Sequence, residues 1–342
     1  MSQGSLATTE LKALSLVSIV VPAYNESGVI VEFNRRLSIV RQELALPSEV
    51  IFVNDGSTDE TLRLLRAVKA ADPTIGIVDL SRNFGKEIAL TAGLDHTCGD
   101  VVIMIDADLQ HPPELIPKLV ARWRESDADI VYGQRASRSG ESYTRKLTSR
   151  TFYWVINALS GRLVPADAGD FRILSRRTVD ALAGIRERHR FMKGLFAWIG
   201  YRQIPMFYEA ELRFAGDSKW NYWKLWNFSI EGITSFSIGP LKVATYAGII
   251  TAILAIVYGI YMVLRTIIFG NPVPGFPSLL VAILFLGGLQ LIFLGIIGEY
   301  LGRTFNEVKQ RPLYLVKEWE PVAQGSRCAP KSAPEKGEQT NC

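Results

Sequence analysis

The chain has 342 residues, is 48% hydrophobic and carries a formal net charge of +4, so it can form one sizeable folded domain and a smaller second part. Its three cysteines, at positions 98, 328 and 342, and its three histidines are scattered, so they give no support to transition-metal binding, and the unpaired cysteines suit a reducing compartment. We expect no nucleic-acid partner, and the N-terminus lacks the basic-then-apolar pattern of a signal peptide.

Apolar strands alternate with amphipathic helical stretches in the first half of the chain. We expect strands at about residues 17–21, 50–54, 75–79 and 101–105, and a helix at about 59–71. Strands separated by helices are typical of right-handed crossovers. The pattern therefore predicts an α/β domain with a mostly parallel sheet that is covered on both faces.

A polar cluster follows each of these strands. The clusters are "PAYNE" (22–26), "NDGSTD" (54–59), "DLSRNFGKE" (79–87) and "DADLQ" (106–110). The carboxyl ends of parallel strands share one edge of the sheet, where ligands bind. We therefore expect the four clusters to meet in one crevice.

Some of these polar residues have a structural alternative. Ser57 or Thr58, followed by acidic residues, is a good helix start, and we favour capping over ligand binding for them. Asp55 lies at a strand end before a glycine, so we favour a ligand role for it, as an acceptor for a base or ribose. Neither G-x-G-x-x-G nor G-x-x-x-x-G-K-[ST] occurs, so the usual phosphate cradles of dinucleotide and P-loop proteins are missing.

Asp106 and Asp108 directly follow the apolar strand at 101–105, where buried negative charge must be neutralised. Alternating carboxylates suit a hard divalent cation, because Mg²⁺ and Mn²⁺ take oxygen ligands, often together with substrate phosphates. Such a cation would also offset the charge on a departing diphosphate. The pair therefore predicts a metal–diphosphate site.

Two long apolar stretches follow in the second half. There is no charge from Val243 to Leu264 and, after Arg265, none until Glu299, and "FGNPVPGFPS" (269–278) reads as a short loop between the stretches. This pattern predicts a transmembrane hairpin. Basic residues flank its outer ends, namely Lys219, Lys224, Lys242, Arg303, Lys309, Arg311 and Lys317, so the positive-inside rule places both ends and the N-terminal domain in the cytoplasm.

The segments around the hairpin fit a membrane-surface protein. Residues 222–240 are aromatic-rich and weakly charged, which predicts an interfacial helix, with a helix of a soluble core as the alternative. Gly288, Gly295, Gly298 and Gly302 fall near one helical face, which allows close contact within the hairpin or between subunits of a homo-oligomer. The tail from about residue 323 is poor in apolar residues and is expected to be disordered.

Several segments together carry a resemblance to a known family. They are "VVPAYNE", "NDGSTD", "LSRNFGKE", "DADLQHPPE", "YGQR", "GDFR" and "LRFAGDSKW". In this order they resemble glycosyltransferase family two, which has a GT-A fold. Within that family they resemble the polyprenyl-phosphate sugar transferases, which include dolichol-phosphate mannose synthases and bactoprenol-phosphate glucosyltransferases. The likeness runs from about residue 16 to residue 315.

The resemblance implies a role for each matching position. The nucleotide-sugar pocket would contain Pro22, Tyr24, Glu26, Val53, Asp55, Asp106, Ala107, Gln110 and Arg135, with Asp106 and Asp108 as ligands of Mg²⁺ or Mn²⁺. The acceptor phosphate would meet Arg145, Arg172, Arg213 and Lys219, although a solvated helix face is an equal alternative for Arg145. The catalytic set implied is Asp108, Asp170, Arg213 and Lys219. The Q-x-x-R-W segment of processive synthases does not occur, so one sugar is expected per reaction.

The expected chemistry needs no strong base. A phosphate monoester has a second pKa of about 6, so a lipid phosphate is already largely anionic at neutral pH and can attack a sugar C1 directly, with inversion. Arg213 and Lys219 would hold the two phosphates, and Asp170 would orient a cation or the acceptor.

The sequence thus predicts a multi-pass enzyme of the bacterial cytoplasmic membrane. Its predicted parts are a tail (1–15), a cytoplasmic GT-A domain (16–220), an interfacial helix (221–240), two transmembrane helices (241–268 and 278–302) and a cytoplasmic C-terminal segment (303–342). It would move one sugar, most simply glucose from UDP-glucose, to a polyprenyl phosphate such as undecaprenyl phosphate. GDP-mannose, UDP-N-acetylhexosamine and a UDP-aminoarabinose-type donor are the alternatives within the class, and a non-catalytic membrane scaffold is the alternative outside it.

Overall fold

The computed structural model describes residues 14–135, 168–188, 190–208, 239–269 and 275–323. The chain divides into two compact units. The first comprises Met1–Tyr153, Leu163–Trp220 and Pro312–Cys342, and the second comprises Trp154–Arg162 and Asn221–Arg311. The predicted interfacial helix lies almost wholly outside the described residues, and so does the tail from residue 324.

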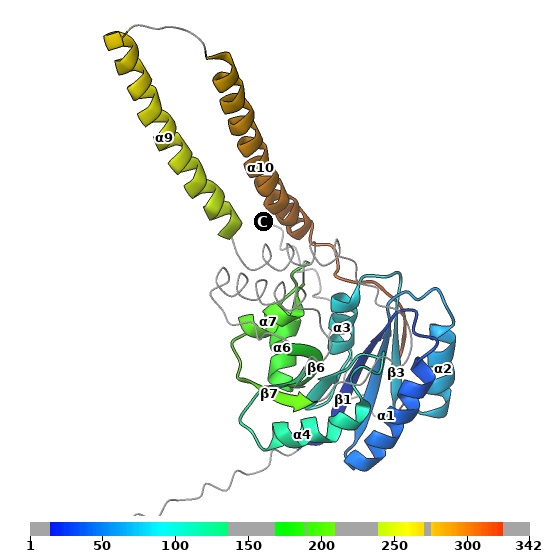
Figure 1. Ribbon diagram of the computed structural model, residues 1–342. Helices are drawn as coiled ribbons and strands as arrows, with labels where there is room; N and C mark the ends of the chain where they lie inside the picture. Colours follow the sequence, from blue (N-terminus) through cyan, green and yellow to red (C-terminus); the bar gives the residue numbers. More distant parts are fainter. Residues whose placement is uncertain (1–13, 136–167, 189, 209–238, 270–274, 324–342) are drawn as a thin grey trace, which may run out of the picture. The chain divides into compact units, whose positions relative to one another are not determined.

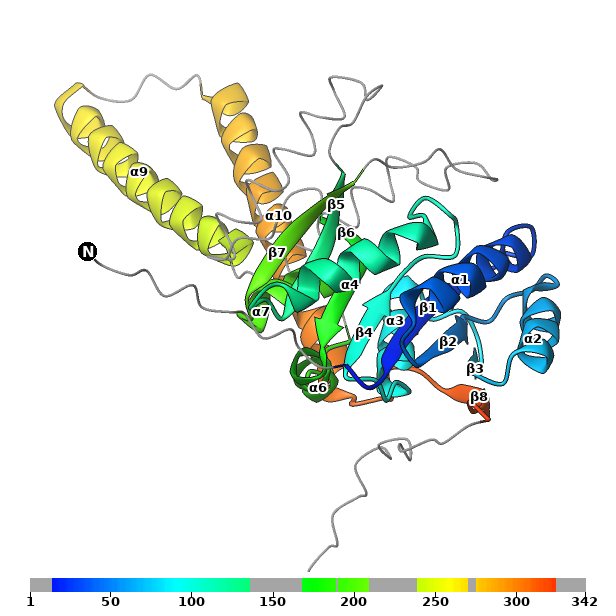
Figure 2. The same cartoon turned by 90° about the horizontal axis from the view of Figure 1, so that it is seen from below.

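The first unit is built on one sheet, whose described strands follow the order β7-β5-β6-β4-β1-β2-β3-β8 (Figures 1 and 2). The strands are β1 (Val17–Ala23), β2 (Ser48–Asn54), β3 (Ile75–Leu80), β4 (Val101–Met104), β5 (Ile130–Arg135), β6 (Ala168–Ser175), β7 (Gln203–Tyr208) and β8 (Val316–Glu320). Pairing is parallel for β1 with β2 and β4, β2 with β3, and β5 with β7, and antiparallel elsewhere. The four predicted strands and the mostly parallel sheet are confirmed.

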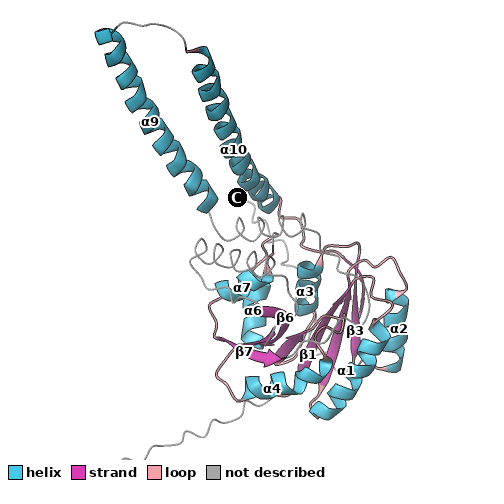
Figure 3. Ribbon diagram, in the orientation of Figure 1, coloured by secondary structure: helices cyan, strands magenta, loops and turns pink. Residues whose placement is uncertain are grey.

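Helices cover both faces of this sheet (Figures 2 and 3). They are α1 (Ile30–Leu44), α2 (Thr61–Ala71), α3 (Lys86–Asp95), the short η1 (Pro113–Leu115), α4 (Ile116–Arg124), α6 (Arg176–Gly184) and α7 (Met192–Trp198). The larger core buries residues of α1 and α4 such as Phe33 and Leu119 against the sheet, and a smaller core packs Ala89 and Ala92 of α3 against its other face. The sheet edge that carries the polar clusters is therefore held from both sides.

Helix α3 packs unusually close to the sheet at Gly93. A Cβ atom at this position would lie 2.3 Å from Val20 Cγ1, which is closer than real Cβ atoms come, and 3.1 Å from Val53 Cγ2, which is a tight contact. Only glycine fits this approach without a shift of the helix. Close packing at Gly93 therefore fixes the position of α3 on the sheet. It also fixes the backbone position of Lys86, the first residue of α3.

The strand β8 was not predicted from the sequence, because the predicted sheet domain ended at residue 220. This segment pairs antiparallel with β3 and covers an edge of the sheet. Arg66 of α2 binds both Glu318 and Glu320, and the ring of Trp319 lies 4.7 Å from the ring of His96 at the end of α3. The residues after the hairpin are thus part of the first unit.

The described helices of the second unit are α9 (Gly239–Phe269) and α10 (Phe276–Val308). Within them, Leu241–Phe269 and Phe285–Val308 are long and apolar enough to cross a membrane, with hydropathies of 2.3 and 1.5 and no burial in their most apolar windows. A Cβ atom at any glycine of the stripe from Gly288 to Gly302 would meet no described atom within 4 Å beyond its own helix. At these glycines the described residues show no close contact within the hairpin, and contact between subunits stays a prediction.

Candidate active site

Hydrogen bonds join the polar segments that follow β1, β2 and β3. The backbone N–H of Asn25 donates to Ser57 Oγ at 3.0 Å, and Asn25 Oδ1 accepts the N–H of Thr58 at 2.8 Å. At the next strand end, Asn54 Nδ2 donates to Asp79 Oδ1 at 2.7 Å. The predicted meeting of the polar segments at one edge is confirmed for these three strands.

The predicted cap of α2 is corrected in detail. The hydroxyl of Ser57 and the backbone of Thr58 are used in bonds to Asn25, so neither side chain caps the helix. Instead, Asp59 accepts the N–H of Thr61, the first residue of α2, at 3.0 Å and also accepts the N–H of Ser27. The N-cap residue of α2 is Glu60, which makes no side-chain capping bond, so Asp59 joins the start of α2 to the segment after β1 without capping the helix.

Asp55 is only 3% exposed and braces the segment before α3. Its Oδ1 accepts the N–H of Phe84 at 2.7 Å, and its Oδ2 accepts the N–H of Gly85 at 2.9 Å. Burial raises the pKa of Asp55, and the two backbone hydrogen bonds only partly offset it. The structure thus gives Asp55 a positioning role, whereas the contact with a base or ribose stays a prediction.

The other predicted nucleotide-pocket residues lie along the same edge. Pro22 and Val53 are buried within β1 and β2, and the Val53 side chain belongs to the core beneath α3. Tyr24 is exposed, and the N–H of Glu26 donates to Thr61 Oγ1 at 2.9 Å. Tyr24 and Glu26 are therefore the members of this group whose side chains are accessible at least in part.

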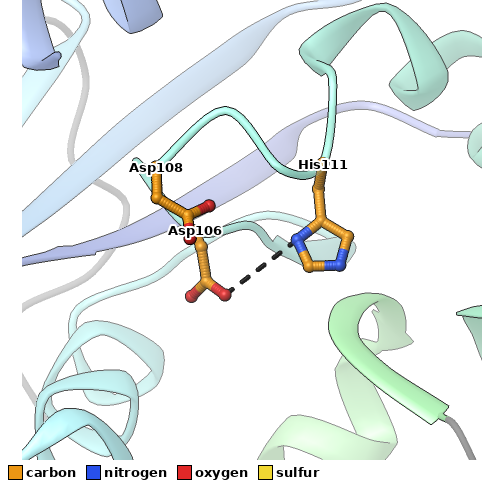
Figure 4. A group of neighbouring side chains, drawn as sticks. All are labelled: Asp106, Asp108 and His111. Atoms are coloured by element: carbon orange, nitrogen blue, oxygen red, sulfur yellow. Dashed lines mark ion pairs between the residues drawn. The ribbon is translucent and has the colours of Figure 1, made fainter. Parts of the chain in front are cut away.

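Asp106, Asp108 and His111 form a cluster in the segment after β4, with ligand atoms within 4.8 Å of one another (Figure 4). His111 Nδ1 lies 4.0 Å from Asp106 Oδ2. The imidazole is 6% exposed, and its Nδ1 has no hydrogen-bond partner among the described residues. Burial lowers the pKa of His111 despite the nearby carboxylates, which favours the neutral ring that can ligate a metal. Two carboxylates and a buried lone pair therefore fit a divalent cation.

Sequence reasoning missed His111, although it stands in the quoted segment "DADLQHPPE". Its ring lies between aromatic neighbours, 5.8 Å from the ring of Phe171 and 5.7 Å from that of Tyr208.

The backbone of the same segment is strained at Leu109, which has a φ of 59°, in the left-handed region that leucine rarely adopts. Such strain costs about 1–3 kcal/mol and is often found at functional sites. Ala107 is buried, and the N–H of Gln110 donates to Asp108 Oδ1 at 3.1 Å.

Lys86 is a second residue that sequence reasoning missed. Its Nζ lies 2.7 Å from Asp106 Oδ2 and 2.5 Å from Asp170 Oδ2, so it joins the metal segment to β6. Burial alone would lower the pKa of Lys86, but the charges of Asp106 and Asp170 hold it well above its usual value. Burial would likewise raise the pKa of Asp170, but Lys86 and Lys193 hold it well below its usual range. Asp170 is therefore an ion-paired carboxylate.

Glu87 follows Lys86 in the first turn of α3 and accepts the backbone N–H of Met192 at 3.2 Å. Burial, and then the negative charge of Asp170, raises the pKa of Glu87 to about 7. The cations of Lys86 and Lys193 act in the opposite direction. The site thus contains a carboxyl group that titrates near neutral pH.

The predicted role of Arg172 is corrected by its burial. The sequence predicted that it meets the acceptor phosphate, but it is 1% exposed within β6. Its guanidinium carbon lies 4.3 Å from the ring centre of Phe196 and 5.4 Å from that of Tyr132, and its Nε donates to Gly169 O at 3.1 Å. A side chain held in this way stabilises the core and does not reach an open site.

The remaining predicted phosphate ligands, Arg145, Arg213 and Lys219, lie outside the described residues. Arg135 is the last residue of β5, where it pairs with Tyr208 of β7, and its side chain is likewise outside the described part. Their roles stay predictions.

Comparison with known proteins gives the family. The model of glycosyl transferase family 2 matches residues 18–182, and a model named GtrB C-terminal hairpin matches residues 239–304. An uncharacterized glycosyltransferase of Synechocystis is 54% identical over 88% of this chain and 95% of its own length. A prophage bactoprenol glucosyl transferase homolog of Escherichia coli K12 is 45% identical, and the bactoprenol glucosyl transferase of Shigella phage SfX is 46% identical. Each covers 88% of this chain and 98% of its own length. The chain is an enzyme of glycosyltransferase family 2, with a GT-A domain followed by a GtrB-type C-terminal hairpin.

Proposed function

We propose that the protein transfers a single glucose from UDP-glucose to a polyprenyl phosphate such as undecaprenyl phosphate. The observation that carries this proposal is a candidate metal cluster in a chain whose relatives are named bactoprenol glucosyl transferase. The Asp106–Asp108–His111 cluster lies at the carboxyl end of β4, and relatives named bactoprenol glucosyl transferase share about half of the residues over nearly their whole length.

The cluster suits a metal-bound nucleotide diphosphate. Asp106, Asp108 and His111 would hold Mg²⁺ or Mn²⁺, which would supply positive charge for the diphosphate leaving group. Carboxylate oxygens and a neutral imidazole are both suitable ligands for Mn²⁺, and carboxylates also suit Mg²⁺.

The ion pairs of Asp170 support a mechanism without a strong base. The low pKa of Asp170 makes its carboxylate a poor proton acceptor near neutral pH, whereas its bond to Lys86 suits a positioning role. The acceptor phosphate is largely a dianion above about pH 6 and can attack C1 of glucose while the UDP oxygen departs from the opposite side. The product would carry an inverted anomeric centre.

The hairpin supports a location at the membrane. Helices α9 and α10 contain apolar stretches of 29 and 24 residues, which exceed the roughly 20 residues that cross a bilayer. We propose a multi-pass protein of the bacterial cytoplasmic membrane with both ends in the cytoplasm, because the basic residues flank the hairpin and are rare in its loop. A polyprenyl phosphate would then reach the enzyme from the bilayer.

The donor is tested with purified full-length protein in detergent, undecaprenyl phosphate and four donors: UDP-glucose, GDP-mannose, UDP-N-acetylglucosamine and a UDP-aminoarabinose-type sugar. We expect UDP-glucose to exceed each of the others at least about tenfold in kcat/KM, which corresponds to about 1.4 kcal/mol. If the enzyme prefers another donor, the proposed sugar is wrong and that donor takes the place of UDP-glucose. The absence of transfer from any donor would favour a scaffold.

A further inference from the structure

One ammonium group neutralises two carboxylates of the site. Lys86 Nζ lies 2.7 Å from Asp106 Oδ2, in the segment after β4, and 2.5 Å from Asp170 Oδ2, on the neighbouring antiparallel strand β6. Both carboxylates are mostly buried, with side chains 18% and 22% exposed. Without a cation between them, the two negative charges would repel each other in a partly desolvated place.

The same carboxylate oxygen also belongs to the candidate metal cluster. Asp106 Oδ2, which receives the ammonium, is the atom that lies 4.0 Å from His111 Nδ1. A divalent cation bound by Asp106 and His111 would therefore stand beside the ammonium of Lys86. Two cations so close repel each other, and the low local dielectric strengthens the repulsion. A metal that arrives alone must compete with Lys86.

The backbone of Lys86 is fixed, whereas its side chain is partly exposed. The preceding residue, Gly85, donates its N–H to Asp55, and α3 is locked against the sheet at Gly93. The Lys86 side chain itself is 41% exposed and has a flexible four-carbon stem. Lysine is also a common point-charge partner for phosphate oxygens.

We propose that Lys86 holds the place of the divalent cation in the donor-free enzyme and moves from Asp106 Oδ2 to the donor diphosphate when metal and nucleotide bind together. This inference rests on the proposed function, since it needs a diphosphate donor. The exchange would make the site bind the metal weakly alone and tightly with the nucleotide, which is a coupling between two ligands. Removing the ammonium should therefore strengthen binding of the metal alone and weaken that coupling.

The test measures free Mn²⁺ by electron paramagnetic resonance during titration of the full-length protein in detergent, with and without UDP. Lys86→Gln should bind Mn²⁺ alone at least about tenfold more tightly than wild type, whereas the gain in Mn²⁺ affinity on adding UDP should fall at least about tenfold. Lys86→Arg keeps the charge and should stay within about threefold of wild type for Mn²⁺ alone. Lys118→Gln, which removes an exposed lysine of α4, is the matched control and should change neither value.

The inference is overturned if Lys86→Gln shows wild-type affinity for Mn²⁺ alone or an undiminished gain with UDP. If Lys86→Gln does not fold, as judged by its thermal unfolding, Lys86→Met provides the same comparison. The proposed function fails separately: wild-type protein would then transfer no glucose and gain no Mn²⁺ affinity with UDP. Transfer by wild type together with unchanged Mn²⁺ binding in Lys86→Gln contradicts the role of Lys86 alone.

Discussion

Asp55 Oδ2 accepts the backbone N–H of Gly85 at 2.9 Å across thirty positions of sequence. Gly85 directly precedes Lys86, and the same carboxylate also holds the N–H of Phe84. The end of β2 therefore fixes the start of α3, where the ammonium that joins Asp106 to Asp170 begins.

Asp55→Asn should destabilise the protein even without a ligand. The substitution replaces one carboxylate oxygen by an NH₂ group that faces a backbone N–H, so one partly buried donor loses its acceptor. We expect a loss of about 1–3 kcal/mol in the free energy of unfolding, measured by urea denaturation. Asp127→Asn, at an 82% exposed side chain, is the control and should be neutral. Unchanged stability with weaker UDP binding would instead support a purely ribose-binding Asp55.

Arg172→Met should act on stability and not on the acceptor lipid. The variant loses the hydrogen bond to Gly169 and the stacking of the guanidinium on Phe196. We expect a loss of at least about 2 kcal/mol by urea denaturation, while the folded enzyme keeps its KM for undecaprenyl phosphate within about threefold. Wild-type stability together with a tenfold higher KM would restore the predicted phosphate contact.

Glu87 should make stability depend on pH near neutrality. Its pKa in the folded protein is raised to about 7, whereas in the unfolded chain the carboxyl group titrates at the ordinary glutamate value of 4.5, so between these values the folded state binds a proton that the unfolded state has released. The stabilisation is complete below about pH 4.5 and is lost as the pH rises through about 7. Lys86, Asp170, Lys193 and Arg190 are the charged groups that act on it.

The check compares thermal unfolding of wild type and Glu87→Gln at several pH values between 5 and 8. Because Gln does not titrate, the difference in Tm between the two proteins should change in favour of Glu87→Gln as the pH rises. A difference that stays constant across this range would show that Glu87 does not titrate there.

Trp319→Ala should loosen β8 from the sheet. The Trp319 ring contacts His96 at the end of α3 and would be 2.9 Å from a Cβ at Gly76, so it fills the space above a glycine of β3. Its truncation leaves a gap in the smaller core, and we expect a loss of about 2 kcal/mol by urea denaturation. Lys317→Arg, on the same strand, keeps the charge that pairs with the buried Asp79 and is the control. Unchanged stability in Trp319→Ala would contradict a packing role for the ring.

The sequence predicted those parts of the fold and site that depend on local pattern. Apolar strands with polar ends placed β1 to β4, and Asp106 and Asp108 stood out because two carboxylates follow a buried strand. The strand β8 escaped prediction because its partner β3 lies more than 200 positions away. Lys86 escaped because a lysine in a polar loop is usually solvated, and its partner Asp170 is 84 positions distant.

Arg172 was misassigned because it belongs to the same short segment, "GDFR", as Asp170. The two residues are two positions apart in β6, and a strand rises about 3.3 Å per residue. Asp170 therefore stands near the end of the strand, beside Lys86, while Arg172 is already within the sheet, between Phe171 and Ile173, which are fully buried. The sequence alone does not show which residues of β6 lie at the site and which lie within the sheet, because this depends on how β6 pairs with its neighbouring strands.

The most direct test of the account is transfer of radiolabelled glucose from UDP-glucose to undecaprenyl phosphate by wild type and Asp108→Asn, measured as product extracted into organic solvent. Asn keeps the shape of Asp108 but removes the charge that a metal-bound diphosphate requires. We predict labelled lipid with wild type and Mg²⁺ or Mn²⁺, and a loss of at least about 100-fold, or about 2.7 kcal/mol, both in Asp108→Asn and in wild type with chelator. Transfer by Asp108→Asn at the wild-type rate in the presence of chelator would contradict it.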